Sequence, residues 1–304
     1  MYSLSTCWNA HRHTDGRAML REIRDLGFTH AELSHGTRIS LVPGILEAVQ
    51  AGEIKISSLH NFCPLPMGVN QSAPNLYQFT AAAPRERDAA IKHTLKTFDF
   101  AVRVNAPVVV LHLGSVELKD YTGRLKELAV RDGQDSRKYA RLKAEAMEKR
   151  EARKKPFVAR LLDSLRQLLP EAESRGLRLG CENREAVEEI PFEDDFGLLF
   201  YELQSPALAY WHDTGHAQIK ENLGFVNHDL HLRTYADRLA GFHLHDVQNL
   251  VHDHCAPGSG SVNFAALKPL VKPDHLKIFE FSPALPVGAL KQGVAHVKEL
   301  WGDS

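Results

Sequence analysis

Cysteine is scarce in this 304-residue chain, and its spacing excludes two kinds of site. The four cysteines stand at positions 7, 63, 181 and 255, so none belongs to a C-x-x-C pair. We therefore expect neither a thiolate zinc site nor a thioredoxin-like redox motif. A few dispersed thiols are typical of a reducing compartment, and we expect a cytoplasmic protein.

Long hydrophobic runs and a charge excess of either sign are also missing. No apolar stretch approaches the length that spans a bilayer and no signal peptide opens the sequence, so we expect no membrane partner. Lysine and arginine total 37 against 38 acidic residues, which leaves a net charge of -1. Without a positive field to attract a polyanion, nucleic acid is not expected as the main partner.

Short apolar runs are present instead, and they alternate with stretches of helical periodicity. Several, such as "VVVLHLG" and "KIFEFS", are almost continuously apolar, which is typical of parallel strands buried on both faces. Alternating strands and helices indicate βαβ units, and eight repeats predict a (β/α)8 TIM barrel, with a doubly wound open sheet as the alternative. The expected strands are Tyr2–Trp8, His30–Ser34, Lys55–Leu59, Val108–His112, Arg178–Glu182, Leu208–Asp213, Ala240–Leu244 and Lys277–Phe281.

No linker rich in proline, glycine or serine divides the chain, so we expect one domain over residues 1–304. The main surplus over a minimal barrel is the segment 116–155, which is polar, strongly charged and biased towards lysine and arginine. Charged segments are usually solvated faces, so we expect a helical excursion after the fourth strand. A lid or a clamp for an anionic group is the alternative.

Histidine is abundant, with 17 residues, and many histidines follow the apolar runs together with acidic residues. Catalytic residues of a TIM barrel lie at the carboxyl ends of its strands, so these side chains should gather at one rim. Carboxylates and imidazoles gathered without a cation would cost several kcal/mol, so we expect a divalent metal, with Mn, Co, Zn or Fe suiting such ligands. The expected rim residues are His60, His112, Glu182, Asp213, His216, His243, His245 and Glu280, followed by His252, Asp253 and His254 in the loop after the seventh strand.

The motifs "VVVLHLGS", "ENRE", "HDTGHA", "FHLHD", "GSG" and "FEFS" stand in an order that resembles the xylose isomerase-like TIM barrels over nearly the whole chain. That superfamily holds sugar and sugar-phosphate isomerases and epimerases, and metal-dependent abasic-site endonucleases. The resemblance implies a metal quartet of Glu182, Asp213, His243 and Glu280. His245 stands where lysine or asparagine is more usual, so His243 is the expected ligand. Some members form dimers or tetramers, which makes a homo-oligomer a candidate.

Further histidines match the additional ligands of the three-metal endonucleases, so extra zinc ions are an alternative expectation. Those enzymes carry an aspartate two residues before the last of these ligands, where this chain has His252 and a displaced Asp253. In an isomerase the same histidines would contact substrate, together with an arginine just past the fifth strand. The expected substrate-binding residues are His60, His112, Arg184, His216 and His254.

The activity expected from this resemblance is a metal-dependent isomerase or epimerase acting on a small sugar or sugar phosphate. Glu182 and Glu280 would be the acid/base pair: one removes a proton next to a carbonyl, a metal stabilises the enediolate, and the other returns the proton. A keto-sugar lyase or dehydratase on the same site and a multi-zinc abasic-site DNA phosphodiesterase stay open as alternatives. A non-enzymatic barrel stays open only because fold does not fix function.

Two smaller features have two interpretations each. Trp8, Phe62 and Trp211 are candidate apolar walls for a sugar face, although aromatic residues near strand ends more often pack in the core. The stretch "GSGS" at 258–261 suits either an anion site for a phosphate or a tight turn.

Overall fold

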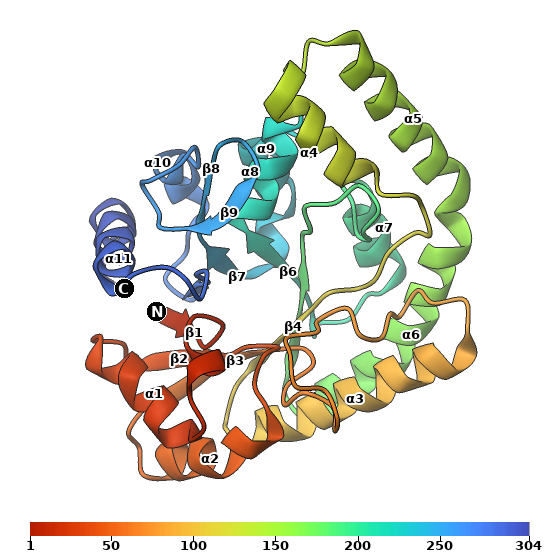
Figure 1. Cartoon of the computed structure of the whole chain (residues 1–304). Helices are drawn as coiled ribbons and strands as arrows, with labels where there is room; N and C mark the ends of the chain where they lie inside the picture. The colour runs from red at the N-terminus through yellow and green to blue at the C-terminus, as the bar shows by residue number, and fades with distance from the viewer. Residues whose placement is uncertain (304) are drawn as a thin grey trace.

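Eight parallel strands close into a barrel in the computed structural model, which describes residues 1–303 (Figure 1). The barrel strands are β1 (Tyr2–Ser5), β2 (His30–Leu33), β3 (Lys55–His60), β4 (Val108–Leu111), β5 (Arg178–Glu182), β6 (Leu208–Asp213), β7 (Leu239–Leu244) and β10 (Leu276–Phe279). Each strand pairs in parallel with the next, and β10 pairs with β1. The predicted TIM barrel is confirmed, and closure between β1 and β10 excludes an open sheet.

All eight predicted strands are present; two were predicted to run at least two residues too far, and every other predicted bound agrees within one residue. The run Tyr2–Trp8 leaves the sheet at Ser5, where the backbone turns and the amide of Trp8 donates to the carbonyl of Ser5. The run predicted to Phe281 ends at Phe279. Both overruns have one cause: apolar residues continue past the strands because they pack in the layer above the barrel, so hydrophobicity alone marks no end.

Helices surround the barrel, and the first shows how the sequence builds them. Asp15 caps its start, since its carboxylate accepts from the amide of Ala18 at 2.7 Å, and Met19, Leu20 and Ile23 face the strands. The surrounding helices are α1 (Gly16–Asp25), α2 (Val42–Gln50), α3 (Pro84–Arg103), α6 (Lys155–Ser174), α7 (Asp195–Glu202), α8 (Thr214–Asn222), α9 (His228–Tyr235), α10 (Phe264–Leu267) and α11 (Val287–Trp301).

The charged segment after the fourth strand forms two helices outside the barrel, α4 (Tyr121–Asp132) and α5 (Arg137–Arg153) (Figure 1). The predicted helical excursion is confirmed, but it is anchored as well as solvated. Tyr121 and Leu142 belong to a small apolar cluster of their own, and buried Arg150 forms an ion pair with Asp195. That the whole chain makes one domain stays a prediction. Within residues 1–303, none of the helices has the length and apolar character needed to cross a membrane.

The floor of the barrel is filled by a large aromatic side chain. Trp211 is fully buried, and glycines on the flanking strands leave room for it: a Cβ at Gly241 would lie 2.7 Å from its ring. The strands are also in register at the opposite, carboxyl end, where Asp213 of β6 stands beside His243 of β7. The filled floor and the aligned ends place the polar residues at one rim.

Candidate metal centre

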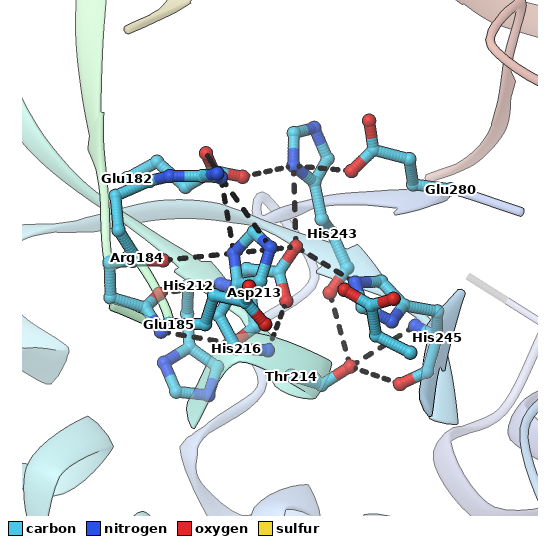
Figure 2. Close-up of polar contacts among 12 residues, drawn as sticks. Glu182, Arg184, Glu185, His212, Asp213, Thr214, His216, His243, His245 and Glu280 are labelled. Carbon is cyan, nitrogen blue, oxygen red and sulfur yellow. Dashed lines mark hydrogen bonds and ion pairs between the residues drawn. The ribbon is translucent and has the colours of Figure 1, made fainter. Parts of the chain in front are cut away.

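Four strands each supply one side chain to a common point at the rim (Figure 2). Glu182 ends β5, Asp213 ends β6, His243 lies near the end of β7, and Glu280 directly follows β10. One ligand atom from each of the four lies within 4.8 Å of the others. The structure therefore brings together all four residues of the predicted metal quartet, as parallel strands ending at one rim should.

His243 stands at the centre of this quartet, with one ring nitrogen turned to the acids. Its Nδ1 lies 2.6 Å from Oε1 of Glu182, 3.1 Å from Oε2 of Glu280 and 3.8 Å from Oδ2 of Asp213. Figure 2 shows these contacts converging on the imidazole. An ion among these atoms would meet an Nδ1 donor and carboxylate oxygens together, a mixed set that suits Mn, Co, Zn or Fe.

Glu32, which the sequence analysis missed, contacts the other side of the same imidazole. Its Oε2 lies 3.2 Å from Nε2 of His243 and accepts from the hydroxyl of Ser58 at 2.8 Å. Glu32 is fully buried, and its Oε1 has no hydrogen-bond partner among the described residues. In the sequence, Glu32 is a carboxylate inside the apolar run "HAEL". It was missed because only residues at the ends of the strands were considered as site residues.

Negative charge is in excess around His243, and this tests whether a cation fits. Glu32, Glu182 and Asp213 have no exposed surface and Glu280 has 4 %. Water does not solvate four such acids, and their mutual repulsion opposes folding unless positive charge offsets it. A divalent ion held by the quartet supplies that charge, so the donor set fits the metal that the sequence predicts.

The two predicted acid/base carboxylates differ sharply in proton affinity. Burial raises the pKa of Glu280 to about 8; His243 opposes this, while Glu182 and Glu32 add to it. Burial alone would raise the pKa of Glu182 too, but Arg184, then His112 and His243, outweigh it and hold that pKa well below its usual range. These opposite shifts arise from the protein groups alone, without the ion that the quartet would hold.

Arg184 points into the rim instead of out to solvent. Its Nη1 donates to Oε2 of Glu182 at 2.8 Å (Figure 2). Its Nε donates to Oε1 of Glu189 at 3.0 Å. Nη1 also lies 3.3 Å from the ring of His216. The predicted substrate-binding residues Arg184 and His216 are thus neighbours, and Glu189 is a half-buried acid that the sequence analysis missed.

His60 and His112 approach the quartet from β3 and from the end of β4. Nε2 of His112 lies 2.9 Å from Oε2 of Glu182, and Nε2 of His60 lies 3.9 Å from the same oxygen. Burial, their largest influence, lowers the pKa of both histidines. His35 packs edge-on against His60, with ring centres 4.6 Å apart. His35 was missed although it follows β2 closely, so the strand-end rule would have found it.

A second group of histidines lies on the far side of Asp213. Ligand atoms of His216, His245 and His254 lie within 4.8 Å of one another. Oδ2 of Asp213 is 3.0 Å from Nε2 of His245 and 3.3 Å from Nδ1 of His216. Burial would lower the pKa of His245, but Asp213 outweighs it and raises that pKa to about 9. This group of three histidines could hold a further cation. One of them, His245, is the residue that departs from the family motif, and it contacts the quartet residue Asp213.

A hydrogen bond explains why Asp213 and His216 stand three residues apart. Its Oδ1 accepts from the backbone amide of His216 at 2.7 Å, so Asp213 caps α8 while its other oxygen faces the quartet. One carboxylate therefore starts the helix and joins the site.

The two smaller sequence features resolve to packing and to a turn. Trp8 donates to the carbonyl of Leu285, Phe62 packs on Tyr77, and Trp211 fills the barrel floor against His243, with ring centres 5.2 Å apart, so all three are packing residues. In the turn at 258–261, the amides of Gly258 and Gly260 both donate to Oδ2 of Asp246 at 2.9 Å. Those amides are already used, so the tight turn, and not the anion site, is the correct interpretation.

Comparisons with known proteins agree on the fold. A family model described as xylose isomerase-like TIM barrel matches residues 20–299. Among solved structures, 3-keto-D-glucoside 4-epimerase YcjR from E. coli is 14 % identical, with 98 % of each chain covered and a TM-score of 0.69. An L-ribulose 3-epimerase is 14 % identical, covering 99 % of this chain and 94 % of that one, with a TM-score of 0.70. D-psicose 3-epimerase from Clostridium cellulolyticum is 12 % identical, covers 99 % of both chains and has a TM-score of 0.68. No protein of curated function matches the sequence.

Proposed function

Because the chain belongs to the xylose isomerase-like TIM barrel family, we propose that it is a metal-dependent isomerase or epimerase of a small sugar or sugar phosphate. One observation carries the proposal: Glu182 and Glu280 lie on either side of His243 Nδ1, at 2.6 and 3.1 Å, so two carboxyl groups face one common point from opposite sides. The solved structures of similar fold whose names give an activity on keto-sugars support the same reaction class.

The quartet of Glu182, Asp213, His243 and Glu280 would hold one divalent ion. When bound, such an ion polarises a carbonyl oxygen and so acidifies the neighbouring C–H bond. The remaining steps belong to side chains of the chain itself. Arg184 and His112 keep the Glu182 carboxylate charged and oriented, and both reach it directly, at 2.8 and 2.9 Å.

Proton transfer follows from the two carboxyl groups. Charged Glu182 takes the proton from the carbon next to the substrate carbonyl, and the electron pair of that C–H bond moves towards the carbonyl oxygen. Glu280, in its protonated form, returns a proton either to the opposite face of the same carbon, which inverts it, or to the former carbonyl carbon. In the second case the hydroxyl proton of the first carbon passes to the oxygen of the former carbonyl, and this completes the shift of the carbonyl. Return to the opposite face makes an epimerase and return to the neighbour makes an isomerase, and the sugar's orientation selects between them.

A keto-sugar lyase or dehydratase would begin with the same proton removal by Glu182. The electron pair would then expel a group on the next carbon instead of being reprotonated. The site supports both outcomes, and the product distinguishes them.

The cluster of His216, His245 and His254 favours a second candidate, a multi-zinc phosphodiesterase of abasic-site DNA. Several ions can clamp the attacking and leaving oxygens of a phosphate. The net charge of -1 opposes this candidate, because duplex binding draws much of its affinity from basic residues that neutralise phosphates.

Solvent exchange tests the proposal directly. The protein is loaded with Mn²⁺ or Co²⁺, incubated with ketoses and keto-glycosides in D₂O, and followed by proton NMR. We expect deuterium at the carbon next to the carbonyl together with an epimer or isomer; exchange with an unsaturated product identifies the lyase. No exchange with any sugar, combined with cleavage of abasic-site DNA by the zinc-loaded protein, would establish the phosphodiesterase instead.

A further inference from the structure

A cavity of about 570 Å³ opens over the quartet and reaches one of its acids. Glu280 lies in its wall with His35 and His254, and polar Ser34 and Gln71 stand in the same wall. We call this space the reaction cavity. A sugar placed here has hydrogen-bonding groups around it and a carboxyl group of the proposed acid/base pair at hand.

A second cavity of about 500 Å³ adjoins the first, and we call it the side cavity. The two share His252, His254 and Ser282 in their walls, so they are neighbours along this edge. The side cavity then runs past the turn at 257–259 to α11, which contributes Ala289 and Gln292. No quartet residue lines it.

The combined volume of the two cavities exceeds the volume that a single sugar ring needs. Pockets of about 300–1,000 Å³ enclose ligands of drug size, which are larger than one hexose. Each of the two cavities lies within that range. A single ring in the reaction cavity, held against Glu280, leaves the side cavity to solvent.

The side cavity also has a definite chemistry. Among its described lining residues there is no lysine, arginine, aspartate or glutamate. The lining consists of amides such as Gln248 and Gln292, imidazoles such as His296, and small apolar side chains such as Ala289 and Pro257. This surface suits an uncharged polyhydroxylated or aromatic group, and it offers no cation to a carboxylate or a phosphate.

We infer that the substrate is a keto-glycoside, with the reacting keto-sugar in the reaction cavity and a neutral group on its glycosidic oxygen in the side cavity. This inference rests on the proposed function, because Glu280 must act on the sugar unit. It adds that a free monosaccharide is a poor substrate, since it forgoes the contacts of the second space.

Two matched variants on one helix test the inference. Ala289 of α11 is half-buried and lines the side cavity, so Ala289→Trp fills that space without touching the quartet. Ala295 of the same helix is exposed and lines neither cavity, so Ala295→Trp controls for the added indole. Circular dichroism and metal content establish that both variants keep the fold.

The measurement is kcat and KM for deuterium exchange into 3-keto-glucose and into its phenyl β-glycoside. We expect kcat/KM at least about tenfold higher for the glycoside, corresponding to about 1.4 kcal/mol. Ala289→Trp should remove that preference through KM and leave 3-keto-glucose unchanged, while Ala295→Trp changes neither substrate. A glycoside bearing a para-carboxylate should have a higher KM than the phenyl glycoside.

Equal kcat/KM for the two substrates in the unmodified protein would overturn the inference while leaving the proposed function standing. So would an equal loss on both substrates in Ala289→Trp. Absence of exchange in either substrate, and in every other keto-sugar, marks failure of the proposed function itself.

Discussion

Glu32 of β2 lies 3.2 Å from Nε2 of His243, the ring nitrogen that faces away from the other quartet residues. The imidazole can therefore donate its Nε2 proton to Glu32 and leave the lone pair of Nδ1 available to an ion held among Glu182, Asp213 and Glu280. Metal-bound histidines commonly donate their second nitrogen to a carboxylate in this way, which fixes the tautomer and the ring orientation. Ser58 holds Glu32 in turn through its hydroxyl.

Replacing Glu32 should weaken metal binding although it is no member of the quartet. We expect Glu32→Leu to lower the affinity for Mn²⁺ or Co²⁺ by about 10–100-fold, and Glu32→Gln, which keeps an acceptor, to lower it less. Titration calorimetry gives the affinities. Leu leaves Nε2 of His243 and the hydroxyl of Ser58 without their acceptor, so stability should also fall in Glu32→Leu and recover in Glu32→Gln. Affinity that stays low in Glu32→Gln while stability recovers separates a role in metal binding from a purely structural one. Unchanged affinity in Glu32→Leu contradicts a positioning role.

Removing either proposed acid/base carboxylate should stop turnover with little change in shape. We expect Glu182→Gln and Glu280→Gln each to slow deuterium exchange into the substrate by about 10²–10⁴-fold. Glu185→Gln is the matched control, because Glu185 is near Glu182 in sequence yet forms an ion pair with Lys126 at 2.7 Å. Near-native exchange in either of the first two variants means that the acid/base assignment is wrong.

Asp246 stabilises the turn after β7 and should be important for folding. Its two oxygens accept from four backbone amides, those of Val247, Gly258, Gly260 and Val262, at 2.8–2.9 Å. Asp246→Ala leaves these amides without their acceptor and should lower the free energy of unfolding by about 2–5 kcal/mol.

Urea unfolding measures the free energy of unfolding lost in Asp246→Ala, and a variant with a smaller expected loss serves as the comparison. Asp120 caps α4 through a single amide, that of Gly123 at 2.7 Å, so Asp120→Ala should cost only about 1 kcal/mol. Equal losses in the two variants would show that the turn depends little on Asp246.

The ion-pair network of Glu193 makes stability depend on pH. Its Oε1 lies 3.0 Å from Nζ of Lys220, which is fully buried, and its Oε2 lies 3.0 Å from Nδ1 of His231. Burial would raise the pKa of Glu193, but Lys220 and His231 outweigh it and lower that pKa from 4.5 to about 2. A carboxyl group whose pKa falls on folding stabilises the folded chain above its unfolded pKa and stops doing so as pH falls through the folded pKa.

Glu193→Gln removes this contribution and leaves Lys220 without its charged partner. The unmodified protein should therefore be more stable than Glu193→Gln by a constant amount above pH 5, and the difference should shrink between pH 4.5 and about 2. Urea midpoints across this range measure it, with Glu299→Gln on an exposed face of α11 as control. A difference that grows on acidification would contradict the assigned direction of the pKa shift.

The strand ends could be predicted from the sequence because burial on both faces leaves continuous apolar runs that polar residues interrupt at the rim. The predicted bounds of β5 and β6 agree with the structure for this reason. The helix α8 could not be found in this way: Thr214–Lys220 are all buried, so the stretch has no polar face to give it a helical period.

Site residues could be predicted where their place at the end of a strand brings them into the site. They could not be predicted where their role depends on a contact with a residue far away in the sequence. The quartet follows from four strand ends, but the pairing of Glu32 with His243 joins residues 211 positions apart. The turn at 258–261 looked open to an anion because nothing local shows that Asp246 occupies its amides. The raised pKa of His245 likewise comes chiefly from Asp213, on the neighbouring strand.

The most direct test of the account is metal stoichiometry at the quartet. The protein and its Asp213→Ala variant are loaded with Mn²⁺, passed through gel filtration and measured by elemental analysis. The account predicts one tightly held ion per chain in the protein and none in the variant, with both folded. No retained ion in either, or an ion retained equally by Asp213→Ala, would contradict the quartet as the metal centre.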